Sequence, residues 1–169
     1  VHEGNNFLSY SYYDGQSLDH LPSVASDNTV YIYGESEFAT QIDGDWVGSL
    51  SLTGFEGGKG YWFGASDNFV FSYNSPSTQL GRFIAKTMPE IPVELAYNQS
   101  TAQYFYLVTE ASIDNVGLSH GDWIVAYNND VIVGARQYES GSVSDVPIMG
   151  IDGEAYSAGY CEPGDIPTI

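Results

Sequence analysis

Short runs of aromatic and β-branched residues, interrupted every few positions by Gly, Asp or Asn, are the feature that most limits how this chain can fold. Side chains of these two kinds suit the pleated surface of a sheet, and the interrupting residues suit tight turns. The runs that predict strands are residues 29–35, 45–52, 60–65, 69–73, 93–97, 103–109, 123–127 and 131–137. With 14 Tyr and 19 Gly against 2 Met, the composition also favours a mainly β chain.

Two pairs of runs predict hairpins, and one segment predicts a helix. Ser66-Asp67-Asn68 joins the third run to the fourth, and Asn128-Asn129-Asp130 joins the last two. These residue types tolerate turn conformations. Between residues 17 and 25, apolar side chains recur at helical spacing, but Pro22 weakens all but a first turn. We therefore expect two small antiparallel β-sandwich or barrel-like modules with at most one short helix.

A looser stretch divides the chain, because Pro76, Pro89 and Pro92 interrupt it and no strand pattern is visible. The predicted organisation is an N-terminal β module at 1–73, a linker at 74–92 and a C-terminal β module at 93–169.

The charge of the chain excludes several classes of partner. Its 22 Asp and Glu residues face four basic ones, so the formal net charge is −18. Such a surface repels phosphate backbones and anionic lipid headgroups, which argues against nucleic-acid and membrane-surface binding. No apolar run approaches the roughly 20 residues that a membrane-spanning helix needs. We therefore expect no membrane insertion.

Carboxylates and turn carbonyls are hard oxygen ligands, which makes Ca²⁺ the one cofactor that the sequence suggests, without requiring it. Three turns supply such groups: Asp152 with Glu154, Asn128 with Asp130, and Asp43 with Asp45. None has the spacing of an EF-hand loop. A solvated acidic turn explains the last two pairs more simply, so Asp152 and Glu154 are the preferred candidates.

Residues that would mark an enzyme are absent or badly spaced. The three histidines, His2, His20 and His120, lack metal-ligand spacing, and no serine lies in a G-x-S-x-G turn. Cys161 is the only cysteine, so it can form no intrachain disulfide and has no partner for a metal site. Carboxylate pairs abound in so acidic a chain and therefore single out no glycosidase site. We expect no catalytic residues.

The aromatic residues raise carbohydrate binding as an alternative, because Trp and Tyr faces can stack on sugar rings. Trp46, Trp62 and Trp123 are the candidate ligand-binding residues. Each also fits a strand pattern beside Gly or β-branched residues, so a position in the core is the competing interpretation.

Several motifs resemble a pair of β modules found in predicted secreted proteins of marine bacteria, algae and their viruses. In the first half these motifs are Gly4-Asn5-Asn6 with Ser9, residues 34–39, residues 44–50 and Gly60-Tyr61-Trp62; in the second half they are residues 97–101, 121–124, 133–136, 145–153 and 159–167. The resemblance implies a secreted or surface protein and no established activity. This chain departs from it at Val131-Ile132, where the family usually has a cysteine nearby, and in stopping at Ile169 before a further strand.

Together these features predict a non-enzymatic structural or adhesive module at the cell surface or outside the cell. The chain begins at Val1 rather than Met, which we interpret as the removal of an export signal. The expected partners are copies of the same chain or a surface polymer, joined through strand edges into a filament or surface assembly. A carbohydrate-binding module and a virion surface or appendage protein are the alternatives.

Overall fold

The computed structural model describes residues 1–76 and 85–169 and divides the chain into two compact units, Val1–Met88 and Pro89–Ile169. The division falls inside the predicted linker at 74–92, of which residues 77–84 lie outside the described part. Asn74 still belongs to unit 1, since its backbone oxygen accepts a hydrogen bond from Gln16 Nε2 at 3.0 Å. The expected mainly β architecture is confirmed, in the form of several small antiparallel sheets.

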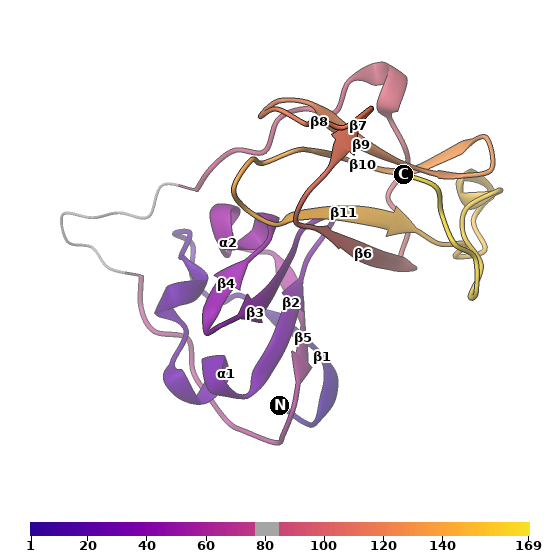
Figure 1. The fold of residues 1–169 in the computed structure, drawn as a ribbon. Helices are drawn as coiled ribbons and strands as arrows, with labels where there is room; N and C mark the ends of the chain where they lie inside the picture. Colours follow the sequence, from indigo (N-terminus) through magenta and orange to yellow (C-terminus); the bar gives the residue numbers. More distant parts are fainter. Residues whose placement is uncertain (77–84) are drawn as a thin grey trace. The chain divides into compact units, whose positions relative to one another are not determined.

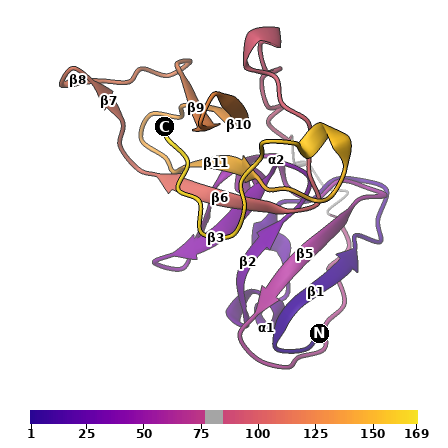
Figure 2. The ribbon, with the colours of Figure 1, turned by 90° about the vertical axis from the view of Figure 1, so that its right-hand side faces the viewer.

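Unit 1 contains one open, five-stranded antiparallel sheet (Figures 1 and 2). Across the sheet the order is β1 (Gly4–Ser9), β5 (Gly60–Ala65), β2 (Thr29–Tyr33), β3 (Phe38–Ile42) and β4 (Asp45–Val47). Successive side chains of a strand alternate between the two faces, so the register decides which residues share a face. Phe7 is opposite Trp62, Trp62 is opposite Tyr33, and Tyr33 is opposite Phe38.

One face of this sheet is the core of unit 1. Tyr61, Phe63, Ile32 and Ala39 are buried there and are covered by side chains of the helices and of the segment after β5. Around Tyr10 and Phe55 the core is mainly aromatic, with ring centroids 5.0 to 6.1 Å apart; the other rings of this group are Tyr12, Tyr61, Phe63, Phe69, Phe71 and Tyr73.

Two of the strand predictions in unit 1 need correction. The run 45–52 is a strand only as far as Val47, because Gly48 has φ 105° and the helix α2 (Ser49–Thr53) follows it. The run 69–73 is no strand and forms no hairpin with β5, whose two neighbours are β1 and β2. Its side chains nevertheless alternate, since Phe69 is buried and Val70 is 89% exposed. Period-two burial thus occurs here outside any ladder, although Phe69 exchanges two backbone hydrogen bonds with Val1.

The segment predicted as one helix, residues 17–25, forms two separate turns of helix. These are the 3-10 turn η1 (Leu18–His20) and the helix α1 (Ser23–Asp27), with Pro22 immediately before α1. Proline is tolerated at a helix start, where its missing N–H costs no hydrogen bond. With α2, the described residues contain two five-residue α-helices where the sequence predicted at most one short helix. No described helix is long and apolar enough to cross a membrane.

Unit 2 is built from three two-stranded antiparallel ladders. They are β6 (Gln103–Val108) with β11 (Ser144–Met149), β9 (Trp123–Asn128) with β10 (Val131–Gln137), and β7 (Ser112–Ile113) with β8 (Val116–Gly117). The predicted hairpin over 123–137 is present, with Asn129 at φ 53° in its turn. The predicted strand 93–97 is instead the 3-10 turn η2 (Val93–Leu95), which follows Pro92; a third such turn is η3 (Ala155–Ser157).

A buried ion pair joins β10 to β11 in the core of unit 2. Arg136 Nε donates to the backbone oxygen of Asp145 at 2.9 Å, and Arg136 Nη2 lies 3.3 Å from Asp145 Oδ2. Next to it, the backbone of Gly134 passes so close to the carbonyl of Pro147 that a Cβ would collide with it. Glycine at 134 therefore allows the two ladders to pack.

Candidate functional site

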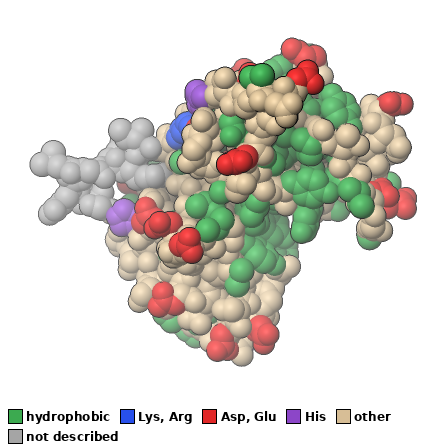
Figure 3. Space-filling view, viewed as in Figure 1, with side chains coloured by type: hydrophobic (Ala, Val, Ile, Leu, Met, Phe, Trp, Pro, Cys, Tyr) green, Lys and Arg blue, Asp and Glu red, His purple; other side chains and the backbone are tan. Residues whose placement is uncertain are grey.

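The outer face of the unit 1 sheet, opposite the core, carries five aromatic rings that we call the aromatic platform. They are Phe7, Trp62, Tyr33, Tyr31 and Phe38. Phe7 is 58% and Trp62 39% exposed, whereas the other three are half-buried. Hydrophobic side chains reach the surface over these strands in the space-filling view (Figure 3). Large side chains exposed together in this way mark a binding surface more often than scattered ones do.

The rings of the platform form a continuous series across four strands. Ring centroids lie 5.1 Å apart for Phe7 and Trp62, 6.3 Å for Trp62 and Tyr33, 6.2 Å for Tyr33 and Tyr31, and 6.1 Å for Tyr31 and Phe38. Beyond Phe7, which is tilted by 52° from Trp62, successive rings differ in orientation by only 17°, 30° and 22°. The platform therefore has a nearly common ring orientation over most of its length.

Two glycines of β5 let rings lie along the sheet instead of standing upright from it. Tyr31 of β2 reaches over Gly64, where a Cβ would collide with the ring, and its hydroxyl donates to Asn5 Oδ1 of β1 at 2.7 Å. Asn5 and Tyr31 are the two cross-strand neighbours of Gly64, so Tyr31 spans two strand spacings of about 4.8 Å each. Phe7 covers Gly60 in the same way.

The chemistry available on the platform is stacking and hydrogen bonding. Burial raises the pKa of the Tyr33 phenol, which is neutral at physiological pH. At the margin, the side-chain nitrogen of Asn5 makes no hydrogen bond to any described residue and can donate to a ligand. A ring face offers no nucleophile, acid or base, so the platform is suited to binding and not to reaction.

Only one of the three tryptophans singled out in the sequence belongs to this surface. Trp62 lies at its centre, between Phe7 and Tyr33. Trp46 lies on the opposite face and packs half-buried against the core of unit 1. Trp123 is half-buried at the start of β9 in unit 2. The structure therefore does not bring the three together as one ligand-binding surface.

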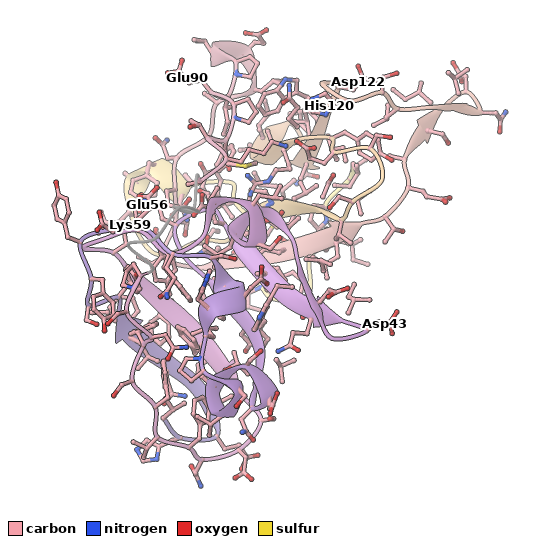
Figure 4. The ribbon with its side chains drawn as sticks, turned by 90° about the vertical axis from the view of Figure 1, so that its left-hand side faces the viewer. Asp43, Glu56, Lys59, Glu90, His120 and Asp122 are labelled. Carbon is pink, nitrogen blue, oxygen red and sulfur yellow. The ribbon has the colours of Figure 1, made fainter. Side chains whose placement is uncertain are left out.

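Asp43 and Asp45, one of the suggested calcium pairs, are placed by the β3–β4 hairpin. Ile42 is opposite Asp45, so Asp43-Gly44 is a two-residue loop, and its φ angles are 54° and 91°. Asp-Gly with two positive φ values is the residue pair that such a hairpin loop prefers. Figure 4 shows Asp43 at the tip of this hairpin. The geometry of the turn therefore explains why Asp43 and Gly44 occupy these two positions.

The other suggested calcium ligands occupy turns of unit 2. Asn128 Nδ2 donates to the backbone oxygens of Gly159 at 3.1 Å and Tyr160 at 3.2 Å, and Asp130 lies exposed in the β9–β10 turn. Within residues 1–76 and 85–169, no three His, Cys, Asp or Glu side chains meet as a set that could hold a metal ion. A calcium ion would therefore need ligands of other kinds.

Asp152 fastens the loop after β11 through its carboxylate. Oδ2 accepts hydrogen bonds from the Tyr156 hydroxyl at 2.7 Å and the Thr101 N–H at 3.1 Å, and Oδ1 accepts one from the Glu154 N–H at 3.1 Å. These donors, Tyr156 foremost, hold the pKa of Asp152 well below its usual range. Both oxygens are thus occupied by donors of the protein itself, and Ca²⁺ would have to displace them.

A groove of about 370 Å³ also lies within unit 2, between the β6–β11 ladder and residues 161–167. Tyr104, Tyr106 and Ile148 line one side of it. Cys161 lines it as well, and burial raises the pKa of its thiol. Since the thiolate is the reactive form of cysteine, a raised pKa leaves Cys161 a poor nucleophile.

Four members of the platform were not predicted from the sequence: Phe7, Tyr31, Tyr33 and Phe38. A signal for part of it was nevertheless present, because Gly60, Trp62 and Gly64 alternate along one strand and must share a face. Comparisons with protein-family models, with curated proteins and with solved structures find no match to this chain.

Proposed function

We propose that this protein is a non-enzymatic adhesive module that binds a neutral polysaccharide through the aromatic platform of unit 1. The observation that carries the proposal is the flat seating of Tyr31 over Gly64, next to the exposed rings of Trp62 and Phe7. Rings that lie along a sheet present their faces to a ligand. A row of such faces suits a chain of flat, repeating units.

Sugar rings and nucleic-acid bases are the two kinds of repeating unit that stack on aromatic faces. Bases bring one phosphate each, and a protein of net charge −18 repels them. A neutral polysaccharide carries no such penalty, and its hydroxyl groups can accept from the Asn5 amide. The charge of the chain therefore selects sugars over nucleic acid, and neutral glycans over anionic ones.

A polysaccharide ligand also fits the expected location outside the cell or on a virion, where surface polymers are met. That location, and the filament expected from the sequence, stay predictions. Binding through several rings at once provides adhesion without a deep pocket, because each stacked ring contributes on the order of 1 kcal/mol.

The test is a pull-down of the full chain with insoluble neutral polysaccharides, namely cellulose, chitin, mannan and agarose, followed by titration with soluble fragments of the one that binds. Trp62→Ala should weaken binding about five- to tenfold, the equivalent of one lost stack. Tyr13→Ala is the matched control, since Tyr13 is 97% exposed in unit 1 and is not part of the platform.

A second pair of variants tests the geometry itself. Gly64→Ala pushes the Tyr31 ring off the sheet and should weaken binding several-fold, whereas Gly117→Ala adds a methyl group in open space and should change nothing. Equal binding by Trp62→Ala, Gly64→Ala and their controls, or preferential binding of single-stranded DNA, would refute the proposal.

A further inference from the structure

The outer edge of β1 presents a row of backbone groups that have no hydrogen-bond partner among the described residues. Just beyond the end of the ladder, the backbone N–H of Tyr10 donates to the backbone oxygen of Lys59 at 2.9 Å. The backbone polar groups of Tyr10 therefore point toward the chain that forms β5. In an antiparallel ladder this orientation alternates. Leu8 and Asn6 therefore face β5 as well, and the N–H and C=O groups of Asn5, Phe7 and Ser9 point away from the sheet.

The three outward-facing residues, Asn5, Phe7 and Ser9, are exposed, and no described backbone group hydrogen-bonds to them. A hollow of about 260 Å³ separates Leu8 and Ser9 from the segment that contains Val70 and Tyr73. Natural edge strands are guarded by charge, proline or shortness. The opposite edge, β4, follows that rule with three residues that include Asp45. β1 has six residues, Gly4–Ser9, without a charge or a proline.

We propose that the outer edge of β1 pairs with the same edge of a second copy of this chain, antiparallel about a two-fold axis at Phe7. The outward-facing residues are spaced symmetrically, so Phe7 lies opposite Phe7 of the second copy and Asn5 lies opposite its Ser9. The two-fold axis adds a third pair, Ser9 opposite Asn5 of the second copy, and each of the three pairs can exchange two backbone hydrogen bonds. A strand edge that is complementary to itself is what a two-fold interface requires.

The pairing turns two five-stranded sheets into one of ten strands and brings both aromatic platforms onto one face. Phe7 of each copy then lies between the Trp62 rings of the two copies. The dimer itself is independent of the proposed glycan binding; only the extension of the binding surface rests on that function.

Charge acts against this dimer and gives it a recognisable salt dependence. Each copy carries a formal charge of −18, so the two repel each other at low ionic strength. The paired strands themselves carry no charge. Screening by salt should therefore strengthen the association, the opposite of what an interface held by ion pairs would show.

Amide hydrogen exchange on the full chain tests the proposed register directly. In dilute solution the amides of Asn6 and Leu8 should be protected by β5, while those of Asn5, Phe7 and Ser9 exchange freely. At high protein concentration all five should be protected. An unchanged pattern at every concentration would overturn the proposal, as would a sedimentation coefficient that stays that of a monomer in high salt.

A matched pair of variants at Ser9 completes the test. Ser9→Pro removes an outward N–H and leaves the ladder to β5 intact, so two donors are lost per dimer and association should weaken about ten- to a hundredfold. Ser9→Ala keeps the N–H and should dimerise like the wild type. Equal dimerisation by both variants would refute the pairing.

The two proposals can fail separately. If Ser9→Pro is a folded monomer that still binds the polysaccharide through Trp62, both stand. If the chain dimerises through β1 but no polysaccharide binds, the edge pairing stands and the glycan function falls.

Discussion

At the scale of single residues, two glycines shape the aromatic platform as much as its aromatic side chains do. Gly60 and Gly64 have no side chain of their own, and so a ring from a neighbouring strand occupies the space above each. Covering a glycine in a strand with a cross-strand aromatic ring compensates for the packing that glycine lacks. The platform is therefore a property of pairs of residues on different strands, and neither member of a pair defines it alone.

The contribution of an ion pair to stability likewise depends on its surroundings, as the buried pair of Arg136 and Asp145 illustrates. Arg136→Met leaves the Asp145 carboxylate buried without its cation and should lower the free energy of unfolding by about 3–5 kcal/mol. Lys59→Met is the matched control, because Lys59 Nζ and Glu56 Oε2 form a 2.7 Å pair whose side chains are 46% and 50% exposed. Its loss should cost about 1 kcal/mol or less. Urea unfolding monitored by fluorescence measures both, and equal losses would contradict the argument.

At the scale of elements, local sequence predicted strands well where their composition was uniform. The strands at 29–33, 60–65, 103–108, 123–128 and 131–137 all lie within or close to predicted runs. Strand predictions failed where the formation of a strand depends on a free edge of a neighbouring strand. Residues 69–73 have the alternation of a strand, but both edges of β5 are already taken by β1 and β2. No local pattern states which edges remain free.

An aromatic surface could be named as a candidate from the sequence, but its members could not. Exposed aromatic residues suggested carbohydrate, and Trp62 was among the residues named. Trp46 also lies within a predicted strand run close to a glycine, yet its side chain is on the core face. The face that a residue occupies depends on register, and a shift of one residue exchanges the two faces. Phe7, Tyr31 and Phe38 join Trp62 only through pairing across strands, which the sequence does not specify.

The aromatic core that lies against β5 should make unit 1 sensitive to alkali. Burial raises the pKa of Tyr61 from 10.0 to about 12, and burial raises that of Tyr10 to about 12 as well. Because the folded pKa lies above the unfolded one, these phenols stabilise the fold fully below about pH 10, and the stabilisation is lost as the pH rises toward 12. Tyrosinate absorbance and circular dichroism, followed together with pH, should show late ionisation that coincides with loss of the sheet.

The control for this titration is the chain unfolded in guanidinium, in which the same tyrosines should ionise near pH 10. If the folded and unfolded chains gave superimposable titrations, burial of the phenols would not contribute to stability in the way described.

At the scale of the whole molecule, the two edges of the unit 1 sheet limit what it can assemble into. Pairing of β1 with β1 about a two-fold axis is closed and stops at two copies. A filament needs a second contact, and β4 offers only three residues with Asp45 among them. The expected filament therefore depends on a contact outside this sheet, whereas a dimer with a doubled platform needs none.

The chain should also separate into two independently folding parts, because each unit has its own core. The apolar cluster of unit 1 draws on residues 1–73 only, and that of unit 2 on residues 97–161 only. Units of about 80 residues are near the lower end of what folds unaided but within it. Residues 1–88 expressed alone should melt cooperatively and bind polysaccharide within about twofold of the full chain, which is a difference of less than 0.5 kcal/mol. Residues 89–169 should fold and not bind. Binding by the second fragment, or an unfolded first fragment, would show that the platform is not a property of unit 1 alone.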